Sequence, residues 1–336
     1  MGGVFPLGGA VLGPLLPSSF TVPRGPAPFP SLRTRAAPLM ERIPVHYDKT
    51  AFWRPLFEGD MIPLQVAKGC SHNRCRFCDM YRQPFAAASR DEVAADIVEI
   101  AAWAPQTRRL FLTGGNALCL PQDDLVFALR VIRERMPESP SVGCFARITD
   151  VARKSDDELA ELASLGLRDI SIGAESGYDP ALAAQDKGFT AVDIERQCLR
   201  LEAAGLPYSL FYLTGMAGKG RGTVSADATA ALYSRLSPVH IMVHTMTPFP
   251  GTPLWDDIQK GRFQQAGELE IVAELRRFVE RFEGSAYVLG NHVGNAVRVN
   301  GPLPDCREAM LAELDWGLAH LDEEMLRTWR ASMDSI

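Results

Sequence analysis

Short apolar runs alternate with amphipathic stretches through most of this 336-residue chain, and this alternation constrains the fold more than any other feature. Each run is followed, after a loop, by a stretch of helical periodicity. Strands that alternate with helices pair in parallel, because each helix carries the chain back to the start of the next strand. The pattern predicts a parallel β/α protein, either doubly wound or a full or partial barrel. The apolar runs lie near residues 62–67, 109–113, 141–146, 169–174, 208–213 and 239–246.

Three of the helices are predicted to begin at capping residues. Ser89, Ser155 and Thr190 each have an acidic residue three positions later, which is the pattern of a capping box. Gly166 and Gly205 follow the second and third of these stretches, where a glycine ends a helix readily.

The last part of the chain breaks this alternation. We expect helices over about 270–282 and 305–329, with one or two short strands within 287–299. The sequence therefore predicts a barrel core over residues 41–285 and a C-terminal extension of strands and helices over 286–336.

The first 40 residues differ in composition from the rest. They are rich in proline and glycine and contain no acidic residue before Glu41. We interpret residues 1–40 as a disordered extension, or as sequence translated upstream of a start near Met40. No apolar run of about 18 residues occurs, so we expect no membrane span and a cytoplasmic protein. The net charge of −6 argues against a nucleic-acid-binding surface.

Three of the seven cysteines are close together, directly after the first predicted strand. Cys70, Cys75 and Cys78 indicate a metal site rather than disulfides, because clustered thiols in a cytosolic protein are typical of metal ligands. Three ligands also leave one position open on a group that takes four. The remaining cysteines are scattered, and we expect each to be a small buried apolar residue: Cys119, Cys144, Cys198 and Cys306.

Glycines, charged residues and candidate metal ligands cluster in the loops that follow the predicted strands. A single loop of this kind is explained by the turn itself. In a parallel barrel, however, all of these loops lie on one rim, which is where active sites are found. With a candidate metal site among them, the loops predict a functional rim. They cover residues 69–78, 113–116, 146–147, 173–177, 214–222 and 247–253.

The cysteine loop resembles the signature of the radical S-adenosylmethionine (radical SAM) superfamily, in which three cysteines follow the first barrel strand. Here the gap between Cys70 and Cys75 is four residues, where the family usually has three. Phe77 fits the family's aromatic position beside the adenine. Gly114-Gly115-Asn116 is similar to the family's Gly-Gly-Glu, which holds the methionine amino group, with Asn116 in place of the acid.

Further motifs are similar to one branch of the superfamily, which includes cobalamin-associated and coproporphyrinogen-oxidase-like proteins. They are Glu175-Ser176-Gly177, Lys187-Gly188 and Phe249-Pro250-Gly251-Thr252. The resemblance covers about residues 60–285 and leaves no room for a cobalamin domain before the first strand. It implies a partial (β/α)6 barrel.

The resemblance also implies the chemistry. A [4Fe–4S] cluster held by Cys70, Cys75 and Cys78 would bind S-adenosylmethionine at its open iron. The cluster would cleave it reductively, and the resulting 5′-deoxyadenosyl radical would abstract hydrogen from a small or medium organic substrate in an oxidoreductase-like reaction. A low-potential donor such as ferredoxin or flavodoxin would supply the electron. The implied cofactor-binding residues are Phe77, Gly114, Gly115, Asn116, Arg147, Glu175, Ser176 and Gly215.

Several roles keep an alternative. Arg147 would pair with the methionine carboxylate, or with Asp150, Asp156 or Asp157. Glu175 would bind the ribose or the amino group, or remain a structural carboxylate at a strand end. Lys219 and Arg221 would bind an anionic substrate or the cofactor, or form a solvated loop.

Other residues near the cysteine loop and beyond the barrel also have predicted roles. His72 is a candidate fourth ligand or a hydrogen-bond donor to a thiolate. Tyr81 is expected beneath the cluster. Asn291, His292 and Asn295 are expected outside the barrel proper, as substrate contacts.

Two other classes of protein remain possible. Cys70, His72, Cys75 and Cys78 would suit a zinc-binding module. The chain would alternatively be a non-catalytic iron–sulfur sensor or scaffold on a barrel fold.

Overall fold

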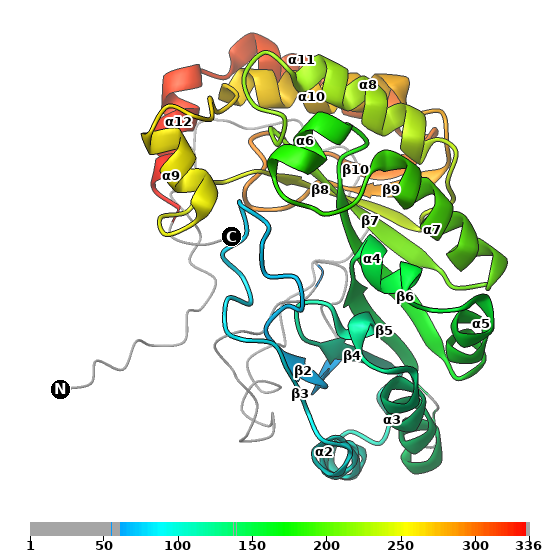
Figure 1. Ribbon diagram of the computed structural model, residues 1–336. Helices are drawn as coiled ribbons and strands as arrows, with labels where there is room; N and C mark the ends of the chain where they lie inside the picture. The colour runs from blue at the N-terminus through cyan, green and yellow to red at the C-terminus, as the bar shows by residue number, and fades with distance from the viewer. Residues whose placement is uncertain (1–54, 56–60, 137, 139, 334–336) are drawn as a thin grey trace.

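The computed structural model describes residues 55, 61–136, 138 and 140–333 (Figure 1). The prediction for residues 1–40 lies outside these residues. Every predicted apolar run forms a strand of one curved sheet, because each is buried along its length between the interior and the covering helices. These strands are β1 (Ile62–Gln65), β4 (Arg109–Thr113), β5 (Ser141–Ala146), β6 (Leu167–Glu175), β7 (Tyr208–Thr214) and β8 (His240–Thr245).

The sheet is open rather than closed. Its order is β1-β4-β5-β6-β7-β8, and every neighbouring pair in this series is parallel. Two strands continue it: β9 (Ala286–Leu289) pairs in parallel with β8, and β10 (Asn300–Leu303) pairs antiparallel with β9. In the described part of the chain, β1 and β10 are the edges and do not pair with each other. The architecture is therefore the expected partial (β/α)6 barrel, extended by two strands.

Most of the helices cover the convex side of this sheet (Figure 1). The capping boxes at Ser89, Ser155 and Thr190 are all formed. Helices that follow strands are α2 (Arg90–Trp103), α3 (Gln122–Arg135), α4 (Ile148–Ala152), α5 (Asp156–Ser164), α6 (Asp179–Ala184), α7 (Ala191–Ala203), α8 (Gly222–Tyr233) and α9 (Pro253–Gln259). The helices of the last part are α10 (Glu268–Arg281), α11 (Arg307–His320) and α12 (Glu323–Ala331). Of these helices, α9 and α12 lie apart from the row on the convex side, at the upper left of Figure 1.

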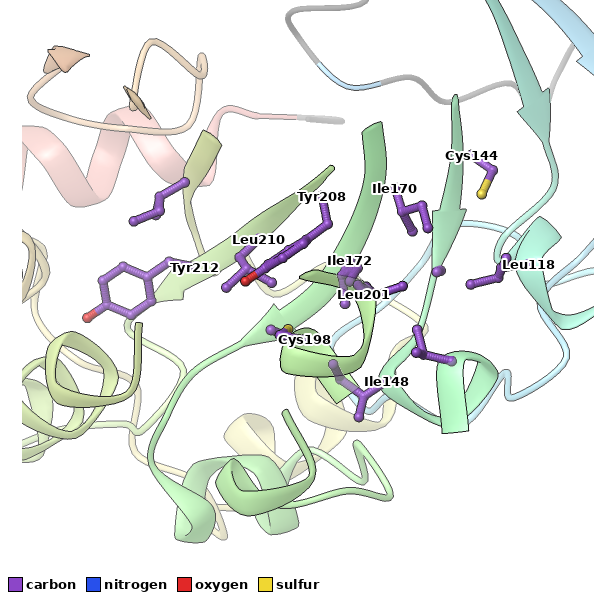
Figure 2. Close-up of a cluster of buried hydrophobic side chains, with 14 of the residues drawn as sticks. Leu118, Cys144, Ile148, Ile170, Ile172, Cys198, Leu201, Tyr208, Leu210 and Tyr212 are labelled. Carbon is purple, nitrogen blue, oxygen red and sulfur yellow. The ribbon is translucent and has the colours of Figure 1, made fainter. Parts of the chain in front are cut away.

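The main core lies between the sheet and these helices. Strand residues alternate between the two faces of a sheet, and the outward set packs against helical side chains. Figure 2 shows Ile170 and Ile172 of β6 and Leu210 of β7 beside Cys198 and Leu201 of α7, all fully buried. The inward set includes Phe111, Phe145, Phe211 and His244, which lie on the concave side.

The last 50 residues differ from the prediction in two places. The helix predicted over 305–329 is two helices, because Leu321 is extended and Asp322 caps α12 by accepting a hydrogen bond from Met325 N at 2.9 Å. One of the short strands predicted within 287–299 is formed by β9, and a second, β10, begins just beyond this range at Asn300. β9 and β10 belong to the same sheet as the barrel strands. The domain boundary expected at residue 285 stays a prediction.

The four scattered cysteines differ in burial. Cys144 and Cys198 are buried in the core as expected, whereas Cys119 and Cys306 are only half-buried, which the sequence did not indicate. None of the helices that the structure describes combines the length and hydrophobicity needed to cross a bilayer.

Candidate functional site

The cysteine loop is closed at its base by two short strands. β2 (Ala67–Lys68) follows β1 directly and pairs antiparallel with β3 (Ala86–Ala87). Residues 69–85 therefore form a loop that leaves the carboxyl end of β1 and returns to it. Gly69 turns the chain into this loop with φ +69°, and a Cβ there would lie 2.4 Å from the carbonyl oxygen of Gln83. The loop therefore needs glycine at its first position.

The three clustered thiols are free and half-buried on this loop. Cys78 N donates to Cys75 O at 3.2 Å, which places the second and third cysteines on one turn. Burial, and then the neighbouring Cys75, raise the pKa of the Cys78 thiol to about 12. A thiol held neutral in this way loses its proton when it binds a metal, because the ligand is the thiolate.

The three thiols are the type of donor that an iron–sulfur cluster takes. Among the described residues, no three His, Cys, Asp or Glu side chains are placed to hold a single metal ion. The expected fourth zinc ligand is also engaged elsewhere, because His72 Nε2 lies 2.7 Å from the carbonyl oxygen of Asp186.

The Gly-Gly pair after β4 packs against the cysteine loop. Gly115 N donates to Gly69 O at 2.8 Å. A Cβ on Gly115 would lie 2.6 Å from Cβ of Cys70, and one on Gly114, where φ is +131°, would lie 2.9 Å from Cβ of Ala67. Gly115 is thus required for close approach to Cys70, and Gly114 for close approach to Ala67. Their contact with a methionine amino group stays a prediction.

Asn116 is fully buried and links the cysteine loop to α4. Its Oδ1 accepts from Ser71 N at 2.9 Å, and its Nδ2 donates to Ser71 Oγ at 2.7 Å and to Asp150 Oδ2 at 2.9 Å. Burial raises the pKa of Asp150, although its hydrogen bonds to Arg147 N and Asn116 oppose that rise. The role predicted for the Asn116 side chain stays a prediction, and it requires an exchange of these partners. Sequence reasoning missed this use of Asp150.

Arg147 lies at the end of β5 with its side chain buried. Nη1 donates to Thr149 Oγ1 at 2.9 Å, and Nη2 donates to the carbonyl oxygen of Lys187. Asp150 accepts from the Arg147 backbone rather than from its guanidinium, so the alternative of an ion pair is not what holds this side chain. Nε is buried without a hydrogen-bond partner, which leaves one donor for a bound group.

Glu175 and Lys187 form a buried ion pair beside the cysteine loop. Lys187 Nζ lies 3.2 Å from Glu175 Oε1 and 5.6 Å from the centre of the Phe77 ring. Burial by itself would lower the pKa of Lys187, but Cys75 and Glu175 outweigh burial and raise it. Sequence analysis assigned Lys187 no role beyond its place in a motif. Its position shows that the motif brings a cation to the cysteines.

Two residues of the predicted cofactor-binding set lie in contacts with helices. Ser176 is buried, accepts from Tyr178 N at 3.1 Å and lies 3.3 Å from Thr229 Oγ1 of α8. Gly215, with φ +81°, donates from its N–H to Glu274 Oε2 of α10 at 2.8 Å. Burial raises the pKa of Glu274 to about 7. A direct role of Ser176 or Gly215 in cofactor binding remains a prediction.

The glycine-rich loop after β7 borders a cavity of about 830 Å³. Lys219 lines this cavity together with Phe249, Trp255 and Arg330, and both Lys219 and Arg221 are exposed. The cavity lies between the loop after β8, α9 and α12. Binding of an anion by Lys219 or Arg221 remains a prediction.

The polar cluster after β9 lies against the barrel rather than outside it. Asn295 Nδ2 donates to Val243 O of β8 at 2.8 Å and to Gly290 O at 2.9 Å, and His292 is buried, whereas Asn291 is exposed. This corrects the predicted position, because β9 pairs with β8 and brings the following loop to its end. Tyr81 is buried near the cysteine loop, with φ +50°.

Residues 64–226 match the model of the Radical SAM superfamily. A comparison with curated proteins found no match. Among solved structures, the chain is similar to the radical S-adenosylmethionine methyltransferase TsrM from Kitasatospora setae, with 16% identity and a TM-score of 0.49 over 59% of this chain and 39% of that chain.

Two further structures are similar at the same level. Methylornithine synthase (PylB) has 16% identity and a TM-score of 0.49, over 75% of this chain and 68% of that one. HydG, a maturase of the [FeFe]-hydrogenase, has 17% identity and a TM-score of 0.46, over 75% and 54%. The chain thus spans about two fifths of the length of TsrM. The family model thus identifies residues 64–226, slightly less than half of the chain, as similar to the Radical SAM superfamily, whose cofactors are a [4Fe–4S] cluster and S-adenosylmethionine.

Proposed function

We propose that this chain is a radical SAM enzyme in which Cys70, Cys75 and Cys78 hold the [4Fe–4S] cluster. When bound, the cluster supplies the electron that cleaves S-adenosylmethionine to a 5′-deoxyadenosyl radical, which takes hydrogen from a small or medium organic substrate. The observation that carries the proposal is the set of three free thiols on one loop, closed by β2 and β3 at the carboxyl ends of the parallel strands.

The surrounding residues would position the cofactors. The unpartnered Nε of Arg147 is a donor suited to the methionine carboxylate, since a guanidinium recognises carboxylates through paired N–H groups. Glu175 is a candidate acceptor at the end of β6, and Lys187 holds it in place at 3.2 Å. Gly114 and Gly115 keep the backbone after β4 against Cys70. These are interpretations of position, and each depends on the residue's own contacts.

The reaction class and the partners are part of the same proposal. We infer an oxidoreductase-like hydrogen abstraction, supported by a low-potential donor such as ferredoxin or flavodoxin. The similar structure of TsrM is a methyltransferase, so methyl transfer is the competing reaction. The seven unpaired cysteines support a reducing compartment, and we place the protein in the cytoplasm.

The test is anaerobic reconstitution of the full chain with iron and sulfide. We expect a brown protein that absorbs broadly near about 400 nm and forms 5′-deoxyadenosine from S-adenosylmethionine with dithionite. Replacing Cys70, Cys75 or Cys78 by alanine should remove the iron and the product. The matched control is Cys306→Ala, since Cys306 is also a half-buried free thiol but lies at the start of α11.

Three results would separate the alternatives. Colourless protein containing one zinc would replace this proposal by the zinc module. Brown protein without 5′-deoxyadenosine would leave a sensor or scaffold. If Cys75→Ala still forms 5′-deoxyadenosine, the assignment of Cys70, Cys75 and Cys78 as cluster ligands is wrong.

A further inference from the structure

A row of aromatic rings lies on the concave face of the sheet. Packing against the cysteine loop does not account for these rings. Phe111, Phe145, Phe211 and His244 come from β4, β5, β7 and β8. Ring centres are 5.0 Å apart for Phe111 and Phe145, 6.3 Å for Phe145 and Phe211, and 5.2 Å for Phe211 and His244. The row therefore continues across the inside of the barrel.

Part of this row is accessible although its strands are otherwise buried. Phe145, Phe211 and His244 are half-buried, whereas the outward-facing residues beside them in the sequence are buried. At the other end of these strands, Arg109 of β4 pairs with Asp169 of β6 at 3.2 Å. Phe145 and His244 lie near the carboxyl ends of β5 and β8, the end of the sheet at which the cysteine loop lies.

His244 is held in place by its ring faces rather than by its nitrogens. It stacks on His292 with ring centres 4.0 Å apart and an angle of 17° between the planes. Asn295 fixes the loop that carries His292 by binding the carbonyl oxygens of Val243 and Gly290. Among the residues that the structure describes, no side chain or backbone group forms a hydrogen bond with the His244 ring.

The two imidazoles are neutral at pH 7. Burial lowers the pKa of His244 well below its usual value, and His292 lowers it further. Burial, followed by Arg298 and Arg330, lowers the pKa of His292 to about 4. Gly294 N donates to Nδ1 of His292, so the proton of that ring is on Nε2. A neutral His244 offers one donor and one acceptor and no charge.

We propose that His244 is the polar contact for the substrate, and that the substrate presents a flat, uncharged aromatic or heteroaromatic ring with a hydrogen-bonding group. This inference rests on the proposed function and assigns a substrate class to the same barrel. Phe145 and Phe211 supply apolar walls against which a ring stacks, and the unpartnered nitrogens of His244 bind its substituent.

The experiment compares two probes that differ in one group. Phenol and toluene have the same flat ring and nearly the same size, but only phenol forms hydrogen bonds. Their dissociation constants are measured by ligand-observed NMR on the reconstituted full-length protein with S-adenosylmethionine and without reductant. We expect phenol to bind about tenfold more tightly than toluene, which corresponds to one net hydrogen bond.

Two variants assign this preference to His244. His244→Phe keeps a ring for stacking and removes both nitrogens, so the phenol preference should fall to about one while toluene binding changes less than about twofold. His320→Phe is the matched control, because His320 is an exposed histidine that also stacks on an aromatic ring, Trp316, on α11. It should leave both constants unchanged.

Several results would overturn the inference: no binding of either probe, equal binding of both to the wild type, or a phenol preference that persists in His244→Phe. If His244→Phe fails to load iron, His244→Leu gives the same readout, since it also removes both nitrogens. That variant should lose the phenol preference while both probes bind more weakly, and persistence of the preference in it would contradict the inference. Because binding is measured without reductant, a lack of 5′-deoxyadenosine would affect only the proposed function.

Discussion

The ammonium group of Lys187 lies 3.2 Å from the carboxylate of Glu175, and their side chains are only 4% and 14% exposed. Lys187 also faces the rings of Phe77 and Phe189 at 5.6 and 5.5 Å. The pair joins the end of β6 to the segment after α6 and brings a positive charge close to Cys75. A buried cation next to the proposed cluster ligands affects the stability of the Glu175–Lys187 ion pair. It also affects the energy of adding an electron to the cluster.

Replacing Lys187 by methionine should make the cluster harder to reduce. Without the cation, an added electron is less stabilised in the low-dielectric site, so the midpoint potential should fall by an amount on the order of tens of millivolts. Redox titration followed by electron paramagnetic resonance measures it. Arg74→Met is the control, because Arg74 is on the same loop but its side chain is 65% exposed. An equal shift in both variants, or a rise in Lys187→Met, would contradict the prediction.

Asn116→Ala should loosen the cysteine loop. The substitution removes the hydrogen bonds to Ser71 and leaves the buried Asp150 carboxylate with one partner fewer. We expect a loss of about 1–3 kcal/mol in the free energy of unfolding and faster release of iron to a chelator. Asn291→Ala, at an exposed position, should change neither quantity. Iron release at the wild-type rate would show that Asn116 does not hold the loop.

Glu274 should make stability depend on pH. Burial raises its pKa from 4.5 to about 7 in the folded protein, so the folded state binds this proton more tightly than the unfolded state. The resulting stabilisation is fully present below about pH 4.5 and is lost as the pH rises to about 7, with a total of about 3 kcal/mol. The group lies on α10 and accepts from Gly215 N and Tyr212 Oη.

The measurement is urea unfolding between pH 4.5 and 7.5 for the wild type and Glu274→Gln. The glutamine cannot titrate, so its unfolding free energy should rise relative to that of the wild type as the pH increases through this range. Parallel pH profiles for the two proteins would show that Glu274 does not titrate there.

Arg330→Met should detach α12 from α10. Arg330 forms a bidentate pair with Glu268, in which the side chains are 6% and 3% exposed, and also donates to Thr247 Oγ1 at 3.0 Å. Removing one partner of a buried pair leaves an uncompensated charge and costs about 3–5 kcal/mol. Chemical denaturation measures the loss.

Arg327→Met provides the comparison for this prediction. Arg327 is on the same helix, but its side chain is 66% exposed and its ion pair with Glu324 is long, at 4.0 Å. The change should cost less than about 1 kcal/mol. The double variant Arg330→Met/Glu268→Leu should recover part of the loss, and a failure to do so would indicate that packing rather than charge holds α12.

Local patterns predicted the main elements. The apolar runs became β1 and β4 to β8, and Ser89, Ser155 and Thr190 cap helices as expected, because burial periodicity and capping depend on residues only a few positions apart. The same local reasoning failed at Leu321, where the chain leaves one helix and starts another without proline or glycine.

The amino-acid sequence by itself determined the strands, the helix caps and the three cysteines of one loop, since each of these depends only on residues within a short segment. Only the tertiary structure decided that Asn116 binds Ser71 and Asp150, that Lys187 faces Cys75 and Phe77, and that His292 stacks on His244. These partners are separated by 34 or more residues in most cases, as for Asn116 and Asp150. They meet because parallel strands bring loops that are distant in the sequence to one rim of the barrel. The periodicity of a short segment does not indicate which side chains face one another at that rim.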